Sequence, residues 1–301
     1  MQDAAPHPTP YADGATVDPP RPAETPDNTI SERYRKALGE IRYIADCTRP
    51  DISYATAALA RATHCPTQRH WNFLKRTVRY LLGTSTHGIL LPRNPTAPAL
   101  ISYADADFAN DTVSRKSISG AVSQVYGGTV HWLSKQQPLV AQSTCEAEYI
   151  SAAETAQITV WIRNLLTELG YRQHQPTTLC MDNAAAITIA RNTAPTKRRK
   201  CIDIRYHLLQ DLTHHHAITL KHVTSRRMYA DIMTKPLKPM PFNEHRANLR
   251  VQPPCHQVQF DLTPTVIGPQ TARQGDCDDP QIEDRRRAVH GHDTPTALMV
   301  L

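Results

Sequence analysis

The segment ALISYADAD, residues 99–107, predicts the first strand of a sheet and the first of four acidic motifs. Its apolar first half predicts a short strand that ends at the carboxylate of Asp105. Three more acidic residues, Glu148, Asp182 and Asp231, follow in short motifs of their own. Carboxylates at strand ends and helix starts can converge on divalent metal ions, and two such ions can cleave a phosphodiester. The sequence therefore favours a metal-dependent nuclease.

The chain continues after this strand with a hairpin and a long helix. Ile118–Val125 and Thr129–Leu133 predict two antiparallel strands, because the two glycines between them favour a tight turn. Ser143 and Glu146 have the spacing of a capping box, and Gly170 suits the end of the helix that begins there.

The elements that we expect next alternate between helix and strand. They are a strand over 177–181, helices over 183–191 and 204–212, a strand over 218–223 and a short helix over 228–234. Three early strands followed by such an alternation predict an α/β fold, in which helices pack on a mixed sheet.

A small helical region is predicted in front of that sheet, over residues 32–97. Apolar residues recur at helical spacing from Tyr34 to Ala45, a break follows at Pro50, and a third helix begins after Pro66. Basic residues lie beside the apolar stripe of the third helix. They form either a solvated face or a contact to phosphate.

Both ends of the chain have the composition of disordered segments. Residues 1–31 are rich in Pro, Ala, Thr and Asp, and residues 241–301 are polar and contain Pro without periodicity. Such segments bury too little apolar surface to offset the entropy that ordering would cost. We therefore expect four parts: a disordered segment over 1–31, a helical region over 32–97, an α/β domain over 98–240 and a disordered tail over 241–301.

Charge and cysteine content narrow the class of protein. A net charge of +6 and a pI near 9.0 suit a polyanionic partner. Seven cysteines without a Cys-x-x-Cys pair argue against a disulfide framework or a zinc module. The N-terminus lacks a basic-then-apolar signal pattern, and no apolar run approaches ~18 residues. We expect an intracellular protein, cytoplasmic or nuclear, that is not secreted and has no membrane partner.

Each acidic residue also has a purely structural explanation. Asp105 can end a strand in a turn, and its neighbour Asp107 can equally be the ligand. Glu148 lies near a helix start, where the positive end of the helix dipole favours acids in any case. Asp182 can cap the helix that follows it, and Asp231 can be a solvated helix residue. The metal-site interpretation depends on all four occurring together.

Seven short motifs between residues 98 and 240 follow one another in the order of a known family. They are YADADFA (103–109), RKS with SG (115–117 and 119–120), WLSKQQ (132–137), EAEY (146–149), MDN (181–183), IDIRYH (202–207) and ADIMTKPL (230–237). Together they resemble the ribonuclease H domain of copia-type long-terminal-repeat retrotransposon polyproteins. Residues 32–97 are similar to the C-terminal connection region of the reverse transcriptase that precedes this domain.

The resemblance implies a ribonuclease H-like fold, with a five-stranded mixed sheet flanked by helices. It implies an endonuclease that hydrolyses the RNA strand of an RNA–DNA hybrid and needs two Mg²⁺ or Mn²⁺ ions. Matched motif by motif, the catalytic metal ligands are Asp105, Glu148, Asp182 and Asp231. Glu148 is preferred to Glu146 because it precedes Tyr-x-x-Ala, as in the family. The resemblance also implies the polymerase portion of a retroelement as a partner.

Basic residues near the acidic motifs are candidates for contacts to the hybrid. The run at residues 197–200 offers a phosphate grip, a solvated loop or a nuclear-import patch. Two further cations lie inside family motifs. The nucleic-acid-binding candidates are Lys135, Lys197, Arg198, Arg199, Lys200 and Arg205.

Two functions are compatible with these motifs. The first is an active hybrid ribonuclease that is part or relic of a retrotransposon polyprotein, because the chain has no polymerase Asp-Asp motif, protease motif or integrase zinc motif. The second is a catalytically inactive or host-captured protein that binds nucleic acid or another partner and retains the scaffold.

Overall fold

The computed structural model describes residues 5–15, 28–92, 94, 96–191 and 203–254. These residues fall within one compact unit of the chain, Met1–His256. Within the described ranges, no helix combines the length and the apolar character that crossing a membrane would require.

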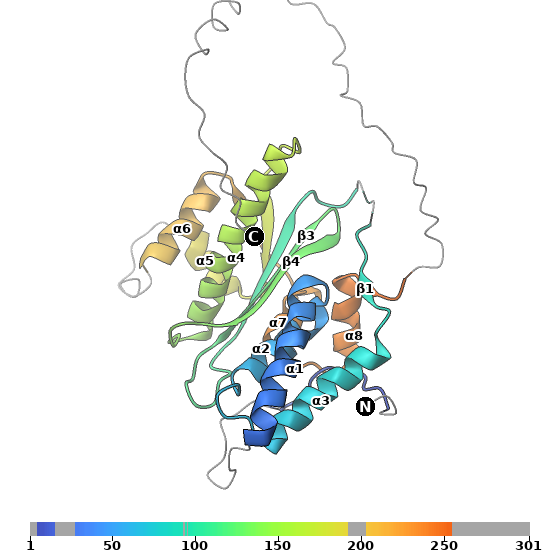
Figure 1. Ribbon diagram of the computed structural model, residues 1–301. Helices are drawn as coiled ribbons and strands as arrows, with labels where there is room; N and C mark the ends of the chain where they lie inside the picture. The colour runs from blue at the N-terminus through green and yellow to red at the C-terminus, as the bar shows by residue number, and fades with distance from the viewer. Residues whose placement is uncertain (1–4, 16–27, 93, 95, 192–202, 255–301) are drawn as a thin grey trace, which may run out of the picture. The chain divides into compact units, whose positions relative to one another are not determined.

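A five-stranded mixed sheet lies within residues 98–240, as predicted (Figure 1). Its strands are β2 (Ile101–Asp107), β3 (Ile118–Val125), β4 (Gly128–Gln136), β5 (Thr177–Met181) and β6 (Ile218–His222), in the spatial order β4-β3-β2-β5-β6. Strand β3 pairs antiparallel with both β2 and β4, whereas β5 runs parallel to β2 and β6. The expected α/β class, with a mixed sheet flanked by helices, is confirmed.

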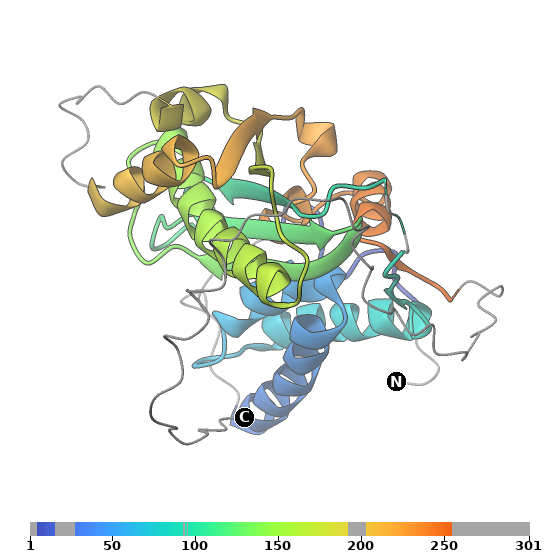
Figure 2. The same ribbon diagram turned by 90° about the horizontal axis from the view of Figure 1, so that it is seen from above.

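Successive residues of β2 face two different groups of helices. Ala104 belongs to an apolar cluster with α4 (Thr144–Glu168), α5 (Ala184–Arg191) and α6 (Asp203–His214). Tyr103 belongs to the cluster of the N-terminal helices instead. Because side chains alternate along a strand, β2 is buried on both sides. Figure 2 shows the strands between the yellow-green helices and the blue ones.

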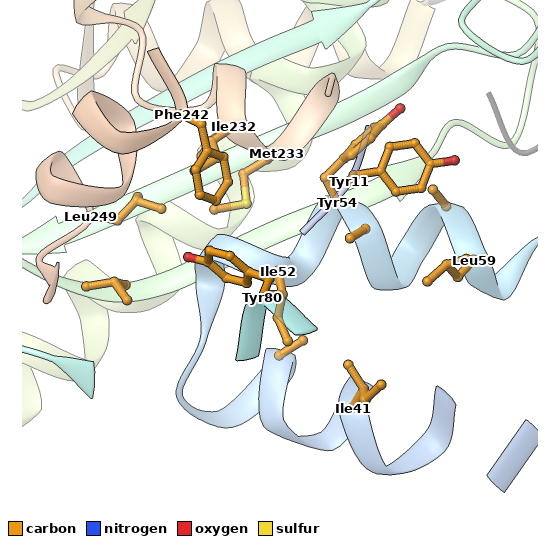
Figure 3. Packing of buried hydrophobic residues seen from close by; sticks show 14 of the residues in the cluster. Tyr11, Ile41, Ile52, Tyr54, Leu59, Tyr80, Ile232, Met233, Phe242 and Leu249 are labelled. Carbon is orange, nitrogen blue, oxygen red and sulfur yellow. The ribbon is translucent and has the colours of Figure 1, made fainter. Parts of the chain in front are cut away.

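The N-terminal helices are the three that the sequence predicts. They are α1 (Asn28–Cys47), α2 (Ser53–Ala60) and α3 (Gln68–Gly83), with a 3-10 turn, η1 (Pro50–Ile52), at the predicted break. One apolar cluster joins them to β3 through Val122 and to Met233 (Figure 3). The boundary expected between residues 97 and 98 therefore crosses a shared core.

The expected disorder of residues 1–31 is wrong for two described parts of that segment. Helix α1 begins at Asn28, and residues 5–15 lie against α3. The Thr77 hydroxyl donates a 3.0 Å hydrogen bond to the Pro10 carbonyl, and the Tyr11 ring stacks on Phe73 with centroids 5.4 Å apart. A single aromatic contact such as that of Tyr11 produces no periodic pattern, so the composition of the segment does not predict it. Residues 1–4 and 16–27 lie outside the described residues.

The expected disorder from residue 241 is also wrong for its first part. Helix α8 (Pro239–Asn248) packs the Phe242 ring edge-on against Tyr80, with centroids 5.6 Å apart. Strand β7 (Val251–Gln252) then pairs antiparallel with β1 (Gly88–Ile89). Both partners lie far back in the sequence, so no local pattern indicates them. Residues 255–301 lie outside the described residues.

Helix α7 (Asp231–Thr234) lies unusually close to β3 at Gly120. A Cβ atom at Gly120 would stand 2.5 Å from Thr234 Cγ2 and 2.9 Å from Met233 Cβ. These separations are shorter than van der Waals contact, so a glycine is required there. Because Gly120 is the register partner of Asp105, the same approach brings α7 next to the first acidic residue.

We predict that Gly120→Ala lowers the free energy of unfolding by about 1–3 kcal/mol, because the added methyl group overpacks a tight contact. Urea denaturation of the full chain would measure the change. Gly39→Ala is a matched control, since a Cβ at Gly39 in α1 meets nothing within 4 Å. That control should be neutral or gain up to about 1 kcal/mol of stability. Equal effects of the two changes would contradict the packing explanation.

Candidate metal centre

Three of the four predicted acidic residues converge at one edge of the sheet. Carboxylate oxygens of Asp105, Glu148 and Asp182 all lie within 4.8 Å of one another. Asp105 lies near the end of β2, and Asp182 directly follows β5. Because β2 and β5 are parallel, their carboxyl ends meet at the same edge. The residues are distant in sequence, but the fold brings their side chains together.

Helix α4 places Glu148 against the two strands. Its first turn is capped by Ser143, whose hydroxyl accepts the Glu146 N–H over 3.2 Å. One turn later, the Ser151 hydroxyl donates to the carbonyl of Asp105 at 2.8 Å and lies 3.2 Å from that of Gly120. This anchor ties α4 to β2 and β3 at the level of Asp105, so the position of Glu148 is set by buried contacts.

The fourth acidic residue, Asp231, lies beside Asp105 rather than within the group of three. The Lys235 ammonium connects the two, at 3.1 Å from Asp231 Oδ1 and 4.0 Å from Asp105 Oδ2. The Thr234 hydroxyl donates a short hydrogen bond to Asp105 Oδ2. Asp231 and Asp105 are therefore neighbours on the α7 side of the site.

The structural explanations offered for the two helix-start acids do not fit their surroundings. Asn183, and not Asp182, caps α5, because its side-chain oxygen accepts the Ala186 N–H over 3.0 Å. Glu146 accepts the Gln142 N–H over 2.7 Å, as a helix-start acid does. Glu148 is instead only 4% exposed and faces the other carboxylates. Nothing in this geometry gives Glu148 or Asp182 a capping role.

The structural explanations for Asp105 and Asp231 do not fit their surroundings either. Asp231 is buried, so it is not a solvated helix residue. Asp107 accepts a hydrogen bond from the Asn110 side chain and is not in the group of three carboxylates. Asp105 is only 2% exposed and lies within β2, which continues to Asp107. It is therefore not a turn residue that ends the strand.

The electrostatics of the site resist full ionisation. Burial raises the pKa of Asp105, Glu148 and Asp231. The negative charge of Asp182 raises the pKa of all three further. Lys235 opposes this shift and lowers the pKa of all three. Burial alone would lower the pKa of Lys235, but Asp105 and Asp231 raise it. Full ionisation would therefore place more negative charge in the centre than Lys235, its cation among the described residues, offsets.

The donor set fits a hard divalent cation such as Mg²⁺ or Mn²⁺. Such ions prefer carboxylate oxygens, and a few carboxylates suffice because water completes the coordination. Glu148 Oε2 is buried and has no hydrogen-bond partner among the described residues. Leaving a buried carboxylate oxygen unpaired is costly, and a cation would satisfy it. Asp105, Glu148 and Asp182 are thus suited to hold a metal, with Asp231 adjacent.

The predicted nucleic-acid-binding residues are only partly described. Residues 197–200 lie outside the described residues, and Arg205 lies in α6 at a position whose side chain is not described. Lys135 is exposed near the end of β4, opposite Ser119 of β3.

Three residues that contact the site carboxylates were not predicted from the sequence to have a role. They are Thr234 and Lys235, which stand in the ADIMTKPL motif, and Ser225, whose hydroxyl donates to Asp182 Oδ2 over 3.2 Å. The spacing of Asp231 and Lys235 at i and i+4 is a signal that could have indicated the ion pair.

Comparison with known proteins finds retrotransposon polyproteins. The chain is 37% identical over 261 residues to the retrovirus-related Pol polyprotein from transposon RE2 of Arabidopsis thaliana, which covers 86% of this chain. It is 35% identical over 238 residues, 78% of this chain, to that from transposon TNT 1-94 of Nicotiana tabacum. The chain spans 18% of the length of each of these polyproteins.

A shorter relative is matched over most of its own length. It is the secreted RxLR effector protein 161 of Plasmopara viticola, which is 43% identical over 129 residues, 43% of this chain and 90% of the effector. No protein-family model matches the chain.

Among solved structures, LC11-RNase H1 is 14% identical, with a TM-score of 0.35, over 45% of this chain and 91% of that one. This score is too low to show a shared family. The family follows instead from the polyprotein relatives and from the motifs set on the observed five-stranded sheet. The chain belongs to the retrovirus-related Pol polyproteins of transposons, and its residues 98–240 carry the motifs that resemble the ribonuclease H domain of the copia type.

Proposed function

We propose that this chain is an endonuclease that hydrolyses the RNA strand of RNA–DNA hybrids, with two divalent ions held by Asp105, Glu148, Asp182 and Asp231. The observation that carries the proposal is the convergence of three buried or half-buried carboxylates within 4.8 Å. Mg²⁺ or Mn²⁺ bound there would supply an activated water and stabilise the leaving oxygen. Membership of the retrovirus-related Pol polyproteins, together with the seven motifs that resemble a ribonuclease H domain, supports the same reaction.

The protein groups have separate roles in this proposal. Asp105, Glu148 and Asp182 would hold the ions, while the hydrogen bonds from Ser151 and Ser225 keep β2 and Asp182 in place. Asp231, next to Asp105 on the α7 side, would complete the set of ligands. Rigid placement of the ligands is what lets a site stabilise developing charge without reorganising.

The substrate proposal depends on the shape of the hybrid rather than on its sequence. Enzymes that grip A-form helices contact phosphates and 2′-hydroxyl groups in the minor groove, so sequence preference should be low. Lys135, Arg205 and the run at residues 197–200 are the proposed phosphate contacts. Affinity that depends on such cations should fall as salt rises. The polymerase portion of a retroelement stays a proposed partner, and an intracellular location stays a prediction.

A second candidate function has one specific observation in its favour. The Plasmopara viticola relative, which the chain matches over 90% of its length, is named an effector protein. A sequence similar to part of this chain is thus found in a protein whose name does not refer to a transposon. The alternative for this chain is a host-captured protein that binds nucleic acid or another partner without cleaving it.

We predict that Asp182→Asn reduces cleavage of a labelled RNA–DNA hybrid by at least about 10³-fold, because loss of a metal ligand removes several kcal/mol of transition-state stabilisation. The full chain would be assayed with Mg²⁺ and with Mn²⁺, and hybrid binding would be measured in parallel. Asp46→Asn is the matched control, since Asp46 lies on α1 and pairs only with Arg42 among the described residues.

The same assay separates the two candidate functions. Cleavage by the unmodified chain and by Asp46→Asn, but not by Asp182→Asn, supports the nuclease. Hybrid binding without cleavage at any Mg²⁺ or Mn²⁺ concentration would instead favour the non-catalytic protein.

We predict that Mg²⁺ stabilises the protein more at high pH than at low pH. Burial and neighbouring charges raise the pKa of Asp105 and Glu148, so the metal-free folded state retains protons that the unfolded state has lost. Metal-free stability should therefore fall as the pH rises above the unfolded carboxyl values of about 4, until the raised folded pKa values are passed.

Metal must displace these protons, so the apparent affinity should rise by up to about tenfold per pH unit for each proton released. Thermal unfolding at several pH values, with and without Mg²⁺, would measure the shift. A metal-induced increase in Tm that is constant from acid to alkaline pH would rule out proton-linked binding at these carboxylates.

A further inference from the structure

Lys235 occupies a position between two of the site carboxylates. Its ammonium lies 3.1 Å from Asp231 Oδ1 and 4.0 Å from Asp105 Oδ2. Of the described ion pairs, those of Lys235 are the ones that involve the four acidic site residues. The side chain is 38% exposed, whereas those of Asp105 and Asp231 are 3% and 9% exposed. The cation thus closes the solvent side of a buried acidic pair.

The backbone around Lys235 is fixed from both sides. The Lys235 N–H donates to the Asp231 carbonyl over 3.3 Å, at the end of α7. Thr234 before it is fully buried, and its hydroxyl is bonded to Asp105. Pro236 after it restricts the chain further, because the proline ring fixes one backbone angle and disfavours helix at the residue before it. Only the four-carbon side chain is free to move.

We propose that Lys235 is a built-in counter-cation that competes with a divalent ion for Asp105 and Asp231 and withdraws into solvent when that ion binds. This inference rests on the proposed function, since it concerns the same site. It makes Lys235 a positioning residue, which keeps the carboxylates together in the metal-free protein and sets the metal concentration at which the site fills.

Charge and side-chain chemistry support the competition. An ammonium and a divalent cation that share one carboxylate pair repel each other, and the repulsion is strong where water is largely excluded. A lysine suits a displaceable role, because its ammonium is a compact charge on a flexible stem. An arginine would bind a carboxylate through a rigid two-pronged contact and would leave less easily. The partial exposure of Lys235 gives the displaced ammonium direct access to water.

The test is the affinity of the metal-free full chain for Mn²⁺ alone, measured by calorimetry at about pH 8 in the same buffer for every variant. Lys235→Met keeps the length of the side chain but removes its charge, and we expect it to bind Mn²⁺ about tenfold more tightly. Lys235→Arg keeps the charge and should bind no more tightly than the unmodified chain. Lys238→Met is the matched control, since Lys238 is exposed and forms no ion pair among the described residues, and should stay within about twofold.

Thermal unfolding gives a second measurement, the dependence of the Tm difference on Mn²⁺, which a purely structural role of Lys235 would not produce. Lys235→Met should lower Tm in the metal-free protein, because the carboxylates lose their cation, and saturating Mn²⁺ should abolish that deficit. A deficit that persists unchanged in Mn²⁺, or Mn²⁺ affinity that is equal to or weaker than that of the unmodified chain, would overturn the proposal for Lys235. If the unmodified chain and all three variants bind no Mn²⁺, the proposed nuclease function fails, and the competition fails with it.

Discussion

The close packing of α7 on β3 at Gly120 determines which side chains meet at the acidic site. It places Asp231, Thr234 and Lys235 next to Asp105, although more than a hundred positions of sequence lie between them. Ile232 and Met233 of α7 also belong to the cluster that includes Ile52, Tyr80 and Phe242 (Figure 3). Helix α7 is therefore held between the sheet and the apolar cluster of the N-terminal helical region.

Burial of several carboxylates in one place opposes folding, and the surrounding contacts offset that opposition. Unpaired buried charge is among the most unfavourable features of a protein interior. Here the cost is reduced by a lysine, a threonine hydroxyl and a backbone N–H, that of Ala106, which is bonded to Glu148. Functional sites commonly hold such locally unfavourable arrangements, which the remaining structure stabilises.

Much of this arrangement could be predicted from the sequence, because it is encoded locally. Alternation, the glycine turn and the Ser143 cap indicate the strands, the hairpin and the start of α4 within a few residues. What could not be predicted depends on partners far away in the chain. Tyr11 against Phe73 and Phe242 against Tyr80 are single aromatic contacts with no period. Asn183 caps α5 and Asp182 joins the acidic site because their side chains point in different directions, which two adjacent positions in a sequence do not indicate.

The apolar cluster shared by α1–α3, β3 and α7 has a consequence for how a longer polyprotein could be divided. A proteolytic cut and separation near residue 97 would expose Tyr34, Leu59 and Leu74 on one product and Val122 and Met233 on the other. Large newly exposed apolar surfaces promote aggregation or re-association. The sheet and the helices that precede it therefore form one folding module, which a cut near residue 97 would disrupt.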